Sequence, residues 1–385
     1  MVPNGWKIIP IKDACEAIID CVNKTAPVVD YKTNFKMLRT TNVRNGRVNT
    51  QDVRYVTEET YLQWVKRGKP KRGDIIFTRE APVGEAGILE EDNGVFLGQR
   101  TMMYRANNDL ADNYYLFYSL SSEYCQKQID NFSNGGTVAH MRVPDCGEIL
   151  INLPPLIEQK KIAQILSTWD KAIATTEQLL TISQQQKKAL MQKLLTGKRR
   201  FSEFKGDWKS VELGSLLEYK QPTPYLVKST DYNNDYETPV LTAGKTFILG
   251  YTNEPEGIYK DKLPVIIFDD FTTDSKFVDF PFKAKSSAMK ILTAREGISI
   301  KYVFEAMQML DFTIGGHQRH WISIFSNLKI AIPEIAEQQK IASVLSTADS
   351  EIKTLKQQLN RLEQEKKALM QQLLTGKRRV RMEAE

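Results

Sequence analysis

The stretch from Glu158 to Phe201 reads EQKKIAQILSTWDKAIATTEQLLTISQQQKKALMQKLLTGKRRF, and the stretch from Glu337 to Val380 reads EQQKIASVLSTADSEIKTLKQQLNRLEQEKKALMQQLLTGKRRV. The two stretches align without a gap at one offset, 337 − 158 = 179, and more than half of their positions are identical. Solenoid repeats recur roughly every 20 to 50 residues, so this longer period indicates a duplicated pair of domains. The chain is therefore expected to run head, helix, head, helix.

Both stretches carry a heptad pattern, with mostly apolar residues at alternating steps of four and three, which predicts a coiled-coil seam. A lysine occupies the same seam position in both copies, Lys187 and Lys366. A homodimeric coiled coil is one interpretation, but a partner in the same chain has a high effective concentration, which favours an antiparallel pair within the chain. We expect the following residues to pair the helices and dock partners: Ile162, Leu166, Ile173, Leu180, Leu190, Leu194, Ile341, Leu345, Ile352, Leu359, Leu369 and Leu373.

Each helix has signals for its start and its end. Pro154 or Pro333 lies just upstream, and Gly197 or Gly376 follows the last leucines. Such prolines and glycines are typical of helix boundaries, and about 37 residues would form a rod of about 55 Å. The Gly-Lys-Arg-Arg run after each helix would cap it, bind phosphates, or do both.

The remaining segments predict a fold of the α+β class, with two mixed α/β domains in tandem. Strand-like runs lie at 74–78, 87–89, 101–104, 265–268 and 288–292, and helical patterns lie at 113–131 and 300–310. We expect a first head at 1–153, a central helix at 154–200, a second head at 201–332 and a C-terminal helix at 333–385. The heads differ strongly while the helices barely differ, as expected if a constant frame holds two different recognition domains.

Composition sets limits on the class of protein. The 385 residues carry a formal net charge of +6, which is compatible with nucleic acid without requiring it. The sequence contains no apolar run long enough to span a membrane and no signal segment, so a soluble intracellular protein is expected. The four cysteines form no CxxC pair, which argues against a zinc site or a disulfide framework.

A search for catalytic motifs leaves none intact. Gly244-Lys-Thr resembles the end of a Walker A loop, but Pro239 stands where its first glycine belongs. Asn152-Leu-Pro-Pro is interrupted relative to the Asn-Pro-Pro-aromatic motif of adenine methyltransferases. Asp269, Asp270 and Asp274 lack a following Glu-x-Lys pair that would complete a nuclease site. We therefore expect no catalytic residue and no metal site in this chain.

Polar and basic residues gather at turns of both heads, where such groups can reach base edges and phosphates. Solvated loop chemistry explains any single cluster equally well, and only their joint presence favours DNA. The candidate DNA-binding residues are Arg39, Thr41, Asn42, Arg44, Arg79, Gln99, Arg100, Thr137, His140, Thr242, Lys245, Lys283, Lys285, His317, Arg319 and His320.

The motifs that end each repeat make the chain recognisable. Leu153-Pro-Pro-Leu-Ile-Glu-Gln159 leads into Lys161-Ile-Ala163 and ends in Leu190-Met-Gln-Lys-Leu-Leu-Thr-Gly197. With Gly73-Asp-Ile-Ile-Phe-Thr-Arg-Glu-Ala-Pro-Val-Gly84 and Ile267-Phe-Asp-Asp-Phe-Thr-Thr273 in the heads, the chain closely resembles the specificity subunit of a Type I restriction–modification enzyme along its full length. One departure is that Pro333 is not followed by a second proline.

The resemblance implies two target recognition domains, each reading one half of a bipartite DNA site, with paired helices that set the spacer. It implies a pseudo-twofold arrangement and docking of two modification (methyltransferase) subunits, joined by restriction (translocase/nuclease) subunits. S-adenosylmethionine, ATP and magnesium are expected on those partners, with no cofactor on this non-catalytic chain. The alternatives are a structural coiled-coil adaptor whose heads bind protein and a methyltransferase that acts alone.

Overall fold

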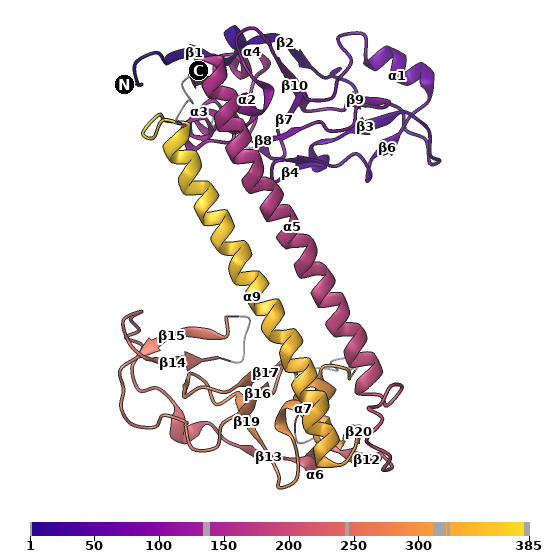
Figure 1. Cartoon of the computed structure of the whole chain (residues 1–385), viewed down its shortest axis with the longest axis vertical. Helices are drawn as coiled ribbons and strands as arrows, with labels where there is room; N and C mark the ends of the chain where they lie inside the picture. The colour runs from indigo at the N-terminus through magenta and orange to yellow at the C-terminus, as the bar shows by residue number, and fades with distance from the viewer. Residues whose placement is uncertain (1, 134–138, 243–245, 311–320, 322–323, 381–385) are drawn as a thin grey trace. The chain divides into compact units, whose positions relative to one another are not determined.

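The computed structural model describes residues 2–133, 139–242, 246–310, 321 and 324–380 (Figure 1). It forms two compact units, Met1–Thr176 with Gln358–Glu385, and Glu177–Gln357. Each unit contains one head together with part of each long helix, α5 (Leu156–Leu194) and α9 (Ile335–Leu373). The sequence predicted four consecutive segments in which each helix is separate from the heads. In the structure each head instead packs with part of both long helices.

In the described residues the first head contains three sheets and four short α-helices. The central sheet has six strands in the order β2-β10-β7-β8-β5-β4. Its strands are β2 (Cys15–Asp20), β10 (Thr101–Ala106), β7 (Ile75–Arg79), β8 (Val83–Ile88), β5 (Arg47–Val48) and β4 (Val43–Arg44). The smaller sheets join β6 (Arg54–Tyr55), β3 (Lys36–Leu38) and β9 (Val95–Leu97), and β1 (Lys7–Pro10) with β11 (Leu150–Leu153). The helices are α1 (Glu58–Trp64), α2 (Asn113–Leu120), α3 (Glu123–Ser133) and α4 (Val143–Gly147).

The central sheet of the first head is buried on both faces. Successive side chains of a strand point to opposite faces, and Ile75 and Phe77 of β7 belong to a core shared with α2, α3 and the long helices. Ile76, between them, belongs to a second core on the opposite face. This two-sided burial explains why the strand-like runs in the sequence are continuously apolar. The expected strands and the helical stretch at 113–131 are confirmed, although that stretch is two helices, α2 and α3.

The second head repeats part of this plan. Its central sheet has the order β13-β19-β16-β17. Its strands are β13 (Leu217–Lys220), β19 (Met289–Ala294), β16 (Val265–Asp269) and β17 (Ser275–Val278). The other sheets join β15 (Ile248–Thr252), β14 (Thr238–Leu241) and β18 (Lys283–Ala284), and β12 (Lys209–Glu212) with β20 (Lys329–Ile332). The helices are α6 (Leu213–Leu216) and α7 (Ile300–Met307), so the expected strands and helix are confirmed.

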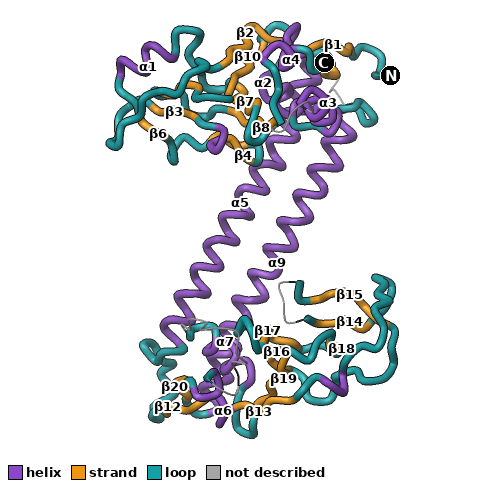
Figure 2. The backbone as a smooth tube through the Cα atoms, turned by 180° about the vertical axis from the view of Figure 1, so that it is seen from behind, coloured by secondary structure: helices purple, strands orange, loops and turns teal. Residues whose placement is uncertain are grey.

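Within each unit, the start of one long helix packs against the end of the other, which makes the pair antiparallel (Figure 1 and Figure 2). In the first unit Ile162 and Leu166 share a core with Leu373. In the second unit Ile341 and Leu345 share a core with Leu194. The twelve seam residues expected from the heptads are all buried or half-buried, so the expected antiparallel pairing is confirmed within each unit.

The ends of both long helices are capped as the sequence predicts. Gly197 and Gly376 adopt left-handed φ values of 69° and 72°, a conformation that glycine reaches without a Cβ clash. The backbone N–H of Arg199 donates to Lys193 O at 3.0 Å, and that of Arg378 donates to Gln372 O at 3.1 Å. The capping role of the Gly-Lys-Arg-Arg run is therefore confirmed. Neither these helices nor any other in the described part of the chain is apolar and long enough to cross a membrane.

Candidate nucleic-acid interface

A buried carboxylate joins the first head to the helical pair. We call this carboxylate, Glu158, and its two partners, Trp6 and Arg379, the clasp of the first unit. Glu158, at the start of α5, is 4% exposed, and its oxygens accept hydrogen bonds from Trp6 Nε1 at 3.0 Å and from Arg379 Nε and Nη2 at 2.6 and 2.7 Å. The hydrogen bond with Glu158 raises the pKa of Arg379. The last arginine of the Gly-Lys-Arg-Arg run is therefore held in an internal contact.

The second unit contains the same clasp. Glu337, which is fully buried, accepts hydrogen bonds from Trp208 Nε1 at 3.1 Å and from Arg200 Nε and Nη2 at 2.9 and 2.7 Å. Glu337 and Arg200 match Glu158 and Arg379 at the repeat offset, since 337 − 158 = 179 and 379 − 200 = 179. Each clasp therefore includes a tryptophan near the start of its head, Trp6 or Trp208.

The glutamine after each clasp carboxylate holds a helix of the head. Gln159 Oε1 accepts from the backbone N–H of Asp112, the N-cap residue of α2, at 3.0 Å. Gln338 Oε1 accepts from the backbone N–H of Ser299, the N-cap residue of α7, at 2.9 Å. Each amide nitrogen donates to the carbonyl of the proline five residues upstream at 2.8 Å. The repeated Glu-Gln pair thus ties the head to the helices.

The seam lysines form ion pairs across the two helices. In the first unit Lys366 Nζ lies 2.5 Å from Asp170 Oδ1, and Asp170 Oδ2 accepts from the Tyr118 hydroxyl at 2.6 Å. Burial, followed by this hydrogen bond, raises the pKa of Tyr118, so its hydroxyl stays protonated as a donor. Because Tyr118 belongs to α2, this contact also joins the head to the helical pair.

In the second unit a cluster of four charged side chains takes the place of the contacts among Lys366, Asp170 and Tyr118. Lys187 Nζ lies 2.6 Å from Asp349 Oδ1 and 3.0 Å from the fully buried Glu305 Oε2. Lys301 Nζ lies 2.7 Å from Asp349 Oδ2 and 2.6 Å from Glu305 Oε1. Burial alone would raise the pKa of Asp349, but hydrogen bonds from the two lysines lower it. Lys187 and Lys366 therefore keep one structural role in both copies with different partners from the heads.

Three candidate DNA-binding residues of the first head, Arg44, Arg100 and His140, lie at the tip of the β7–β8 hairpin. Arg100 Nε lies 3.2 Å from Glu80 Oε2, and His140 Nδ1 lies 3.5 Å from the same oxygen. An isolated β-bridge joins Glu80 to His140. Arg44 reaches the turn of this hairpin, where its Nη2 donates to Ala81 O at 3.4 Å. We call these residues, Arg44, Glu80, Ala81, Arg100 and His140, the hairpin ridge.

Three candidates lie inside the heads, and their predicted role in DNA binding is wrong. Asn42 is 3% exposed and donates to Asn49 O and Asp52 O. Arg79 is 8% exposed and pairs with Asp20 at 3.0 Å. Lys283 is 1% exposed and lies 2.9 Å from Glu254 Oε2. In each case the turn composition suggested exposure, but tertiary contacts bury the polar atoms, which are already bonded.

The other candidates fall into three groups. Thr41, Gln99 and Lys285 are exposed, and Arg39 and Thr242 are half-buried, so for these five residues DNA contact stays a prediction. Gln99 Oε1 accepts from the Thr25 hydroxyl at 3.1 Å. The candidates that lie outside the described residues are Thr137, Lys245, His317, Arg319 and His320.

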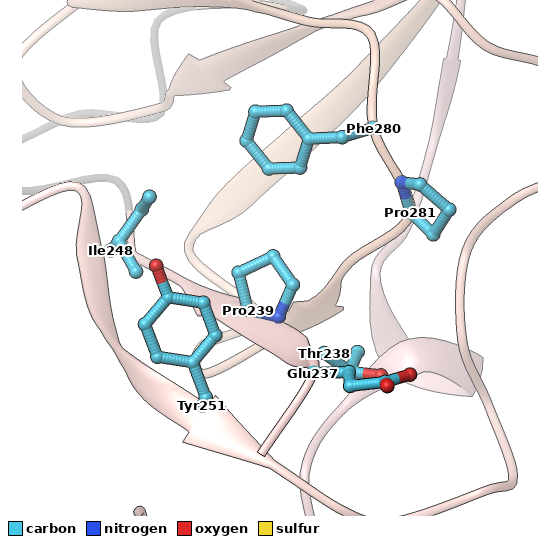
Figure 3. Close-up of a pocket in the computed structure, with 7 residues that line it drawn as sticks. All are labelled: Glu237, Thr238, Pro239, Ile248, Tyr251, Phe280 and Pro281. Carbon is cyan, nitrogen blue, oxygen red and sulfur yellow. The ribbon is translucent and has the colours of Figure 1, made fainter. Parts of the chain in front are cut away.

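An apolar pocket of about 460 Å³ lies on the β14–β15 hairpin of the second head. Figure 3 shows its lining, in which Pro239, Ile248, Tyr251 and Phe280 surround the space and Glu237 lies at one side. Among the described residues that line it there is no lysine or arginine.

Sequence reasoning missed the acidic members of these sites. Glu80 belongs to the motif from Gly73 to Gly84, and Asp170 and Asp349 are identical positions of the repeat, but no role was predicted for these three carboxylates. Identity between the two copies was the available signal for Asp170, Glu158 and their equivalents. Glu80 carried no such signal, because the heads differ in sequence.

Two unlike α+β heads held by the same clasps on a repeated helical frame define a two-headed recognition scaffold. A family model described as Type I restriction modification DNA specificity domain matches residues 3–183 and 205–364. These matches cover most of the chain. The chain therefore belongs to the family of Type I restriction–modification DNA specificity subunits, and DNA sequence recognition is its role.

Curated relatives and solved structures agree with this membership. The Type I restriction enzyme EcoR124I/EcoR124II specificity subunit of Escherichia coli is 47% identical over 179 residues, 43% of this chain and 44% of that protein. The putative MjaX specificity subunit of Methanocaldococcus jannaschii is 26% identical over 99% of this chain and 95% of that protein. The crystal structure of an S subunit from M. genitalium has a TM-score of 0.69, at 16% identity, over 97% of this chain and 98% of that chain. This last likeness concerns the fold.

Proposed function

We propose that each head reads one half of a bipartite DNA site, and that the frame of helices holds the heads and the partner subunits. The observation that carries this proposal is the contrast between the two parts of the chain. The clasps and seam ion pairs recur at one offset of 179 residues, while the described residues of the second head contain no copy of the hairpin ridge of the first. A constant frame with unlike readers is what an asymmetric two-part site requires.

Two modification subunits are proposed to dock on repeated surfaces of the two units. If the partners are identical, their docking surfaces on this chain must recur in both copies. Nine positions of the repeat are identical and exposed in both copies with one member of each pair in each unit. These pairs are Lys161 and Lys340, Thr168 and Thr347, Thr175 and Thr354, Gln185 and Gln364, Lys188 and Lys367, Ala189 and Ala368, Gln192 and Gln371, Lys198 and Lys377, and Arg199 and Arg378.

The long helices are proposed to set the spacer of the DNA site. Each has 39 residues, so each is about 58 Å long at a rise of about 1.5 Å per residue. Half-sites on one face of B-DNA lie about 34 Å apart per helical turn, so rods of this length can set such a separation once their ends are tilted inward. The chain is proposed to be non-catalytic, with S-adenosylmethionine for adenine methylation, and ATP and magnesium for restriction, bound by the partner subunits.

The test is to map methylated adenines in DNA exposed to the full chain assembled with its modification subunits. The expected result is one two-part motif with a fixed gap, and DNA binding that weakens steeply as salt rises, because phosphate contacts release counterions. A structural adaptor whose heads bind protein would show neither. Methyl transfer from S-adenosylmethionine by the purified chain alone would contradict the non-catalytic assignment.

A further inference from the structure

The tip of the β7–β8 hairpin places a carboxylate between two side chains that can meet DNA. The Glu80 side chain is 18% exposed, whereas those of Arg100 and His140 are 53% and 46% exposed. Both contacts use Glu80 Oε2, at 3.2 Å from Arg100 Nε and 3.5 Å from His140 Nδ1. Glu80 Oε2 is the oxygen nearest to both side chains, and Nε is the nitrogen through which Arg100 approaches it.

The backbone fixes where these side chains start. The N–H of Arg79 donates to Arg100 O at 2.9 Å, and the N–H of Met141 donates to Arg79 O at 3.0 Å. Arg100 and Ala81 have left-handed φ values of 69° and 54°, which residues other than glycine adopt only where the surroundings hold them. The three side chains therefore project from a rigid part of the first head.

We propose that Glu80 and Arg100 together read one C·G base pair in the half-site of the first head, with Glu80 as a specificity-determining residue. In the major groove guanine presents O6 and N7, which the terminal nitrogens of an arginine match, and cytosine presents its N4 amino group, which a carboxylate accepts. Arg100 and Glu80 Oε1 supply these two complements side by side. The contact through Oε2 keeps the pair together and positions the imidazole of His140 beside them. This inference rests on the proposed reading of DNA by the heads.

The same position in the second head carries a different chemistry. The bond from Asp270 N to Ala288 O, at 3.3 Å, matches the bond from Arg79 N to Arg100 O, because β16 pairs with β19 as β7 pairs with β10. Ala288 thus stands in the place of Arg100. Phe271, which is 47% exposed, stands in the place of Glu80. The two heads therefore offer different groups at one position of a shared hairpin, as residues that determine specificity should.

The test uses the full chain assembled with its modification subunits and duplexes that carry the mapped two-part site. Each guanine of the site is replaced in turn by 7-deazaguanine, which lacks the N7 acceptor. Native complex should lose about 5- to 150-fold in affinity at one C·G pair, the range of a good bidentate contact. The Arg100→Ala variant should lose little more when that same guanine is replaced.

The second arm measures discrimination between C·G and the other three base pairs at that position. Glu80→Ala should lower this discrimination, because the acceptor for the cytosine N4 amino group is lost, and should leave the part supplied by Arg100 and the other positions of the site unchanged. Glu90→Ala is the matched control, because Glu90 follows the open end of the same hairpin and pairs with Arg72 at 3.9 Å on the surface. The control should discriminate as the native complex does.

Three outcomes overturn the proposal while leaving two-part recognition intact. They are a mapped site without a C·G pair in either half, 7-deazaguanine effects that persist in Arg100→Ala, and unchanged discrimination in Glu80→Ala. The base-replacement arm with native complex does not depend on the folding of any variant. Failure to find a two-part site would instead refute the proposed function itself.

Discussion

The ion pair between Lys366 and Asp170 gives a direct measure of how tightly the first unit holds its two helices together. The pair joins α9 to α5 at 2.5 Å, with side-chain exposures of 19% for the lysine and 40% for the aspartate. We expect Lys366→Met to destabilise the unit because the methionine keeps the packing of the stem and removes the charge. In this variant Asp170 loses the lysine and keeps the hydrogen bond from the Tyr118 hydroxyl.

The magnitude follows from the partial burial of the pair. Fully exposed ion pairs contribute about 0.2–1 kcal/mol, and removing one partner of a fully buried pair costs about 3–5 kcal/mol. The pair between Lys366 and Asp170 lies between these limits, and its more exposed member remains solvated. A double-mutant cycle of Lys366→Met and Asp170→Asn should therefore give a coupling energy of about 1–2 kcal/mol.

Urea unfolding of the full chain, followed by circular dichroism, measures the four members of the cycle. Arg361 and Glu365 provide the matched control, because they form an ion pair of 2.7 Å on the exposed side of the same helix. That pair should show a coupling of at most about 0.5 kcal/mol. A Lys366 and Asp170 coupling as small as that of the control would refute the interpretation of the seam lysines as contacts that hold the two helices together.

Three further predictions concern other parts of the chain. Gly197→Ala should destabilise the second unit by roughly 1–2 kcal/mol in thermal unfolding, because alanine must adopt a left-handed φ. Gly376→Ala should destabilise the first unit more, because its Cβ would also collide with a neighbouring proline. Equal losses of stability in the two variants would contradict this prediction. Burial opposes the ionised form of Glu254, yet backbone hydrogen bonds and Lys283 lower its pKa from 4.5 to about 2. The stabilising contribution of Glu254 is therefore present above pH 4.5 and is lost as the pH falls toward 2. Glu254→Gln should flatten the acid limb of a plot of melting temperature against pH, and an unchanged limb would contradict this role of Glu254. Lys188→Glu with Lys367→Glu should weaken assembly with the modification subunits in a pull-down at constant melting temperature, since both lysines are exposed, and full assembly would exclude them from the docking surface.

The sequence predicted the frame more completely than the candidate site. Heptad spacing depends on local periodicity, so the seam from Ile162 to Leu194 could be assigned without knowing the fold. Capping by Gly197 was equally local. Membership of turn clusters did not decide which polar side chains are exposed, because exposure is set by distant segments. Arg79 is buried against Asp20, which is 59 residues away.

The sequence by itself determined the duplication, the antiparallel helices and the α+β class of the heads, because repeats and periodicities are written along the chain. Only the tertiary structure showed that the repeated Glu158 and Glu337 are the centres of clasps, each joining a head's tryptophan to an arginine at the end of the opposite helix. Only the tertiary structure brought Glu80 to Arg100 and His140. Such contacts join residues far apart in sequence, and the strand pairing that creates them leaves no periodic trace in the side chains at the hairpin tip.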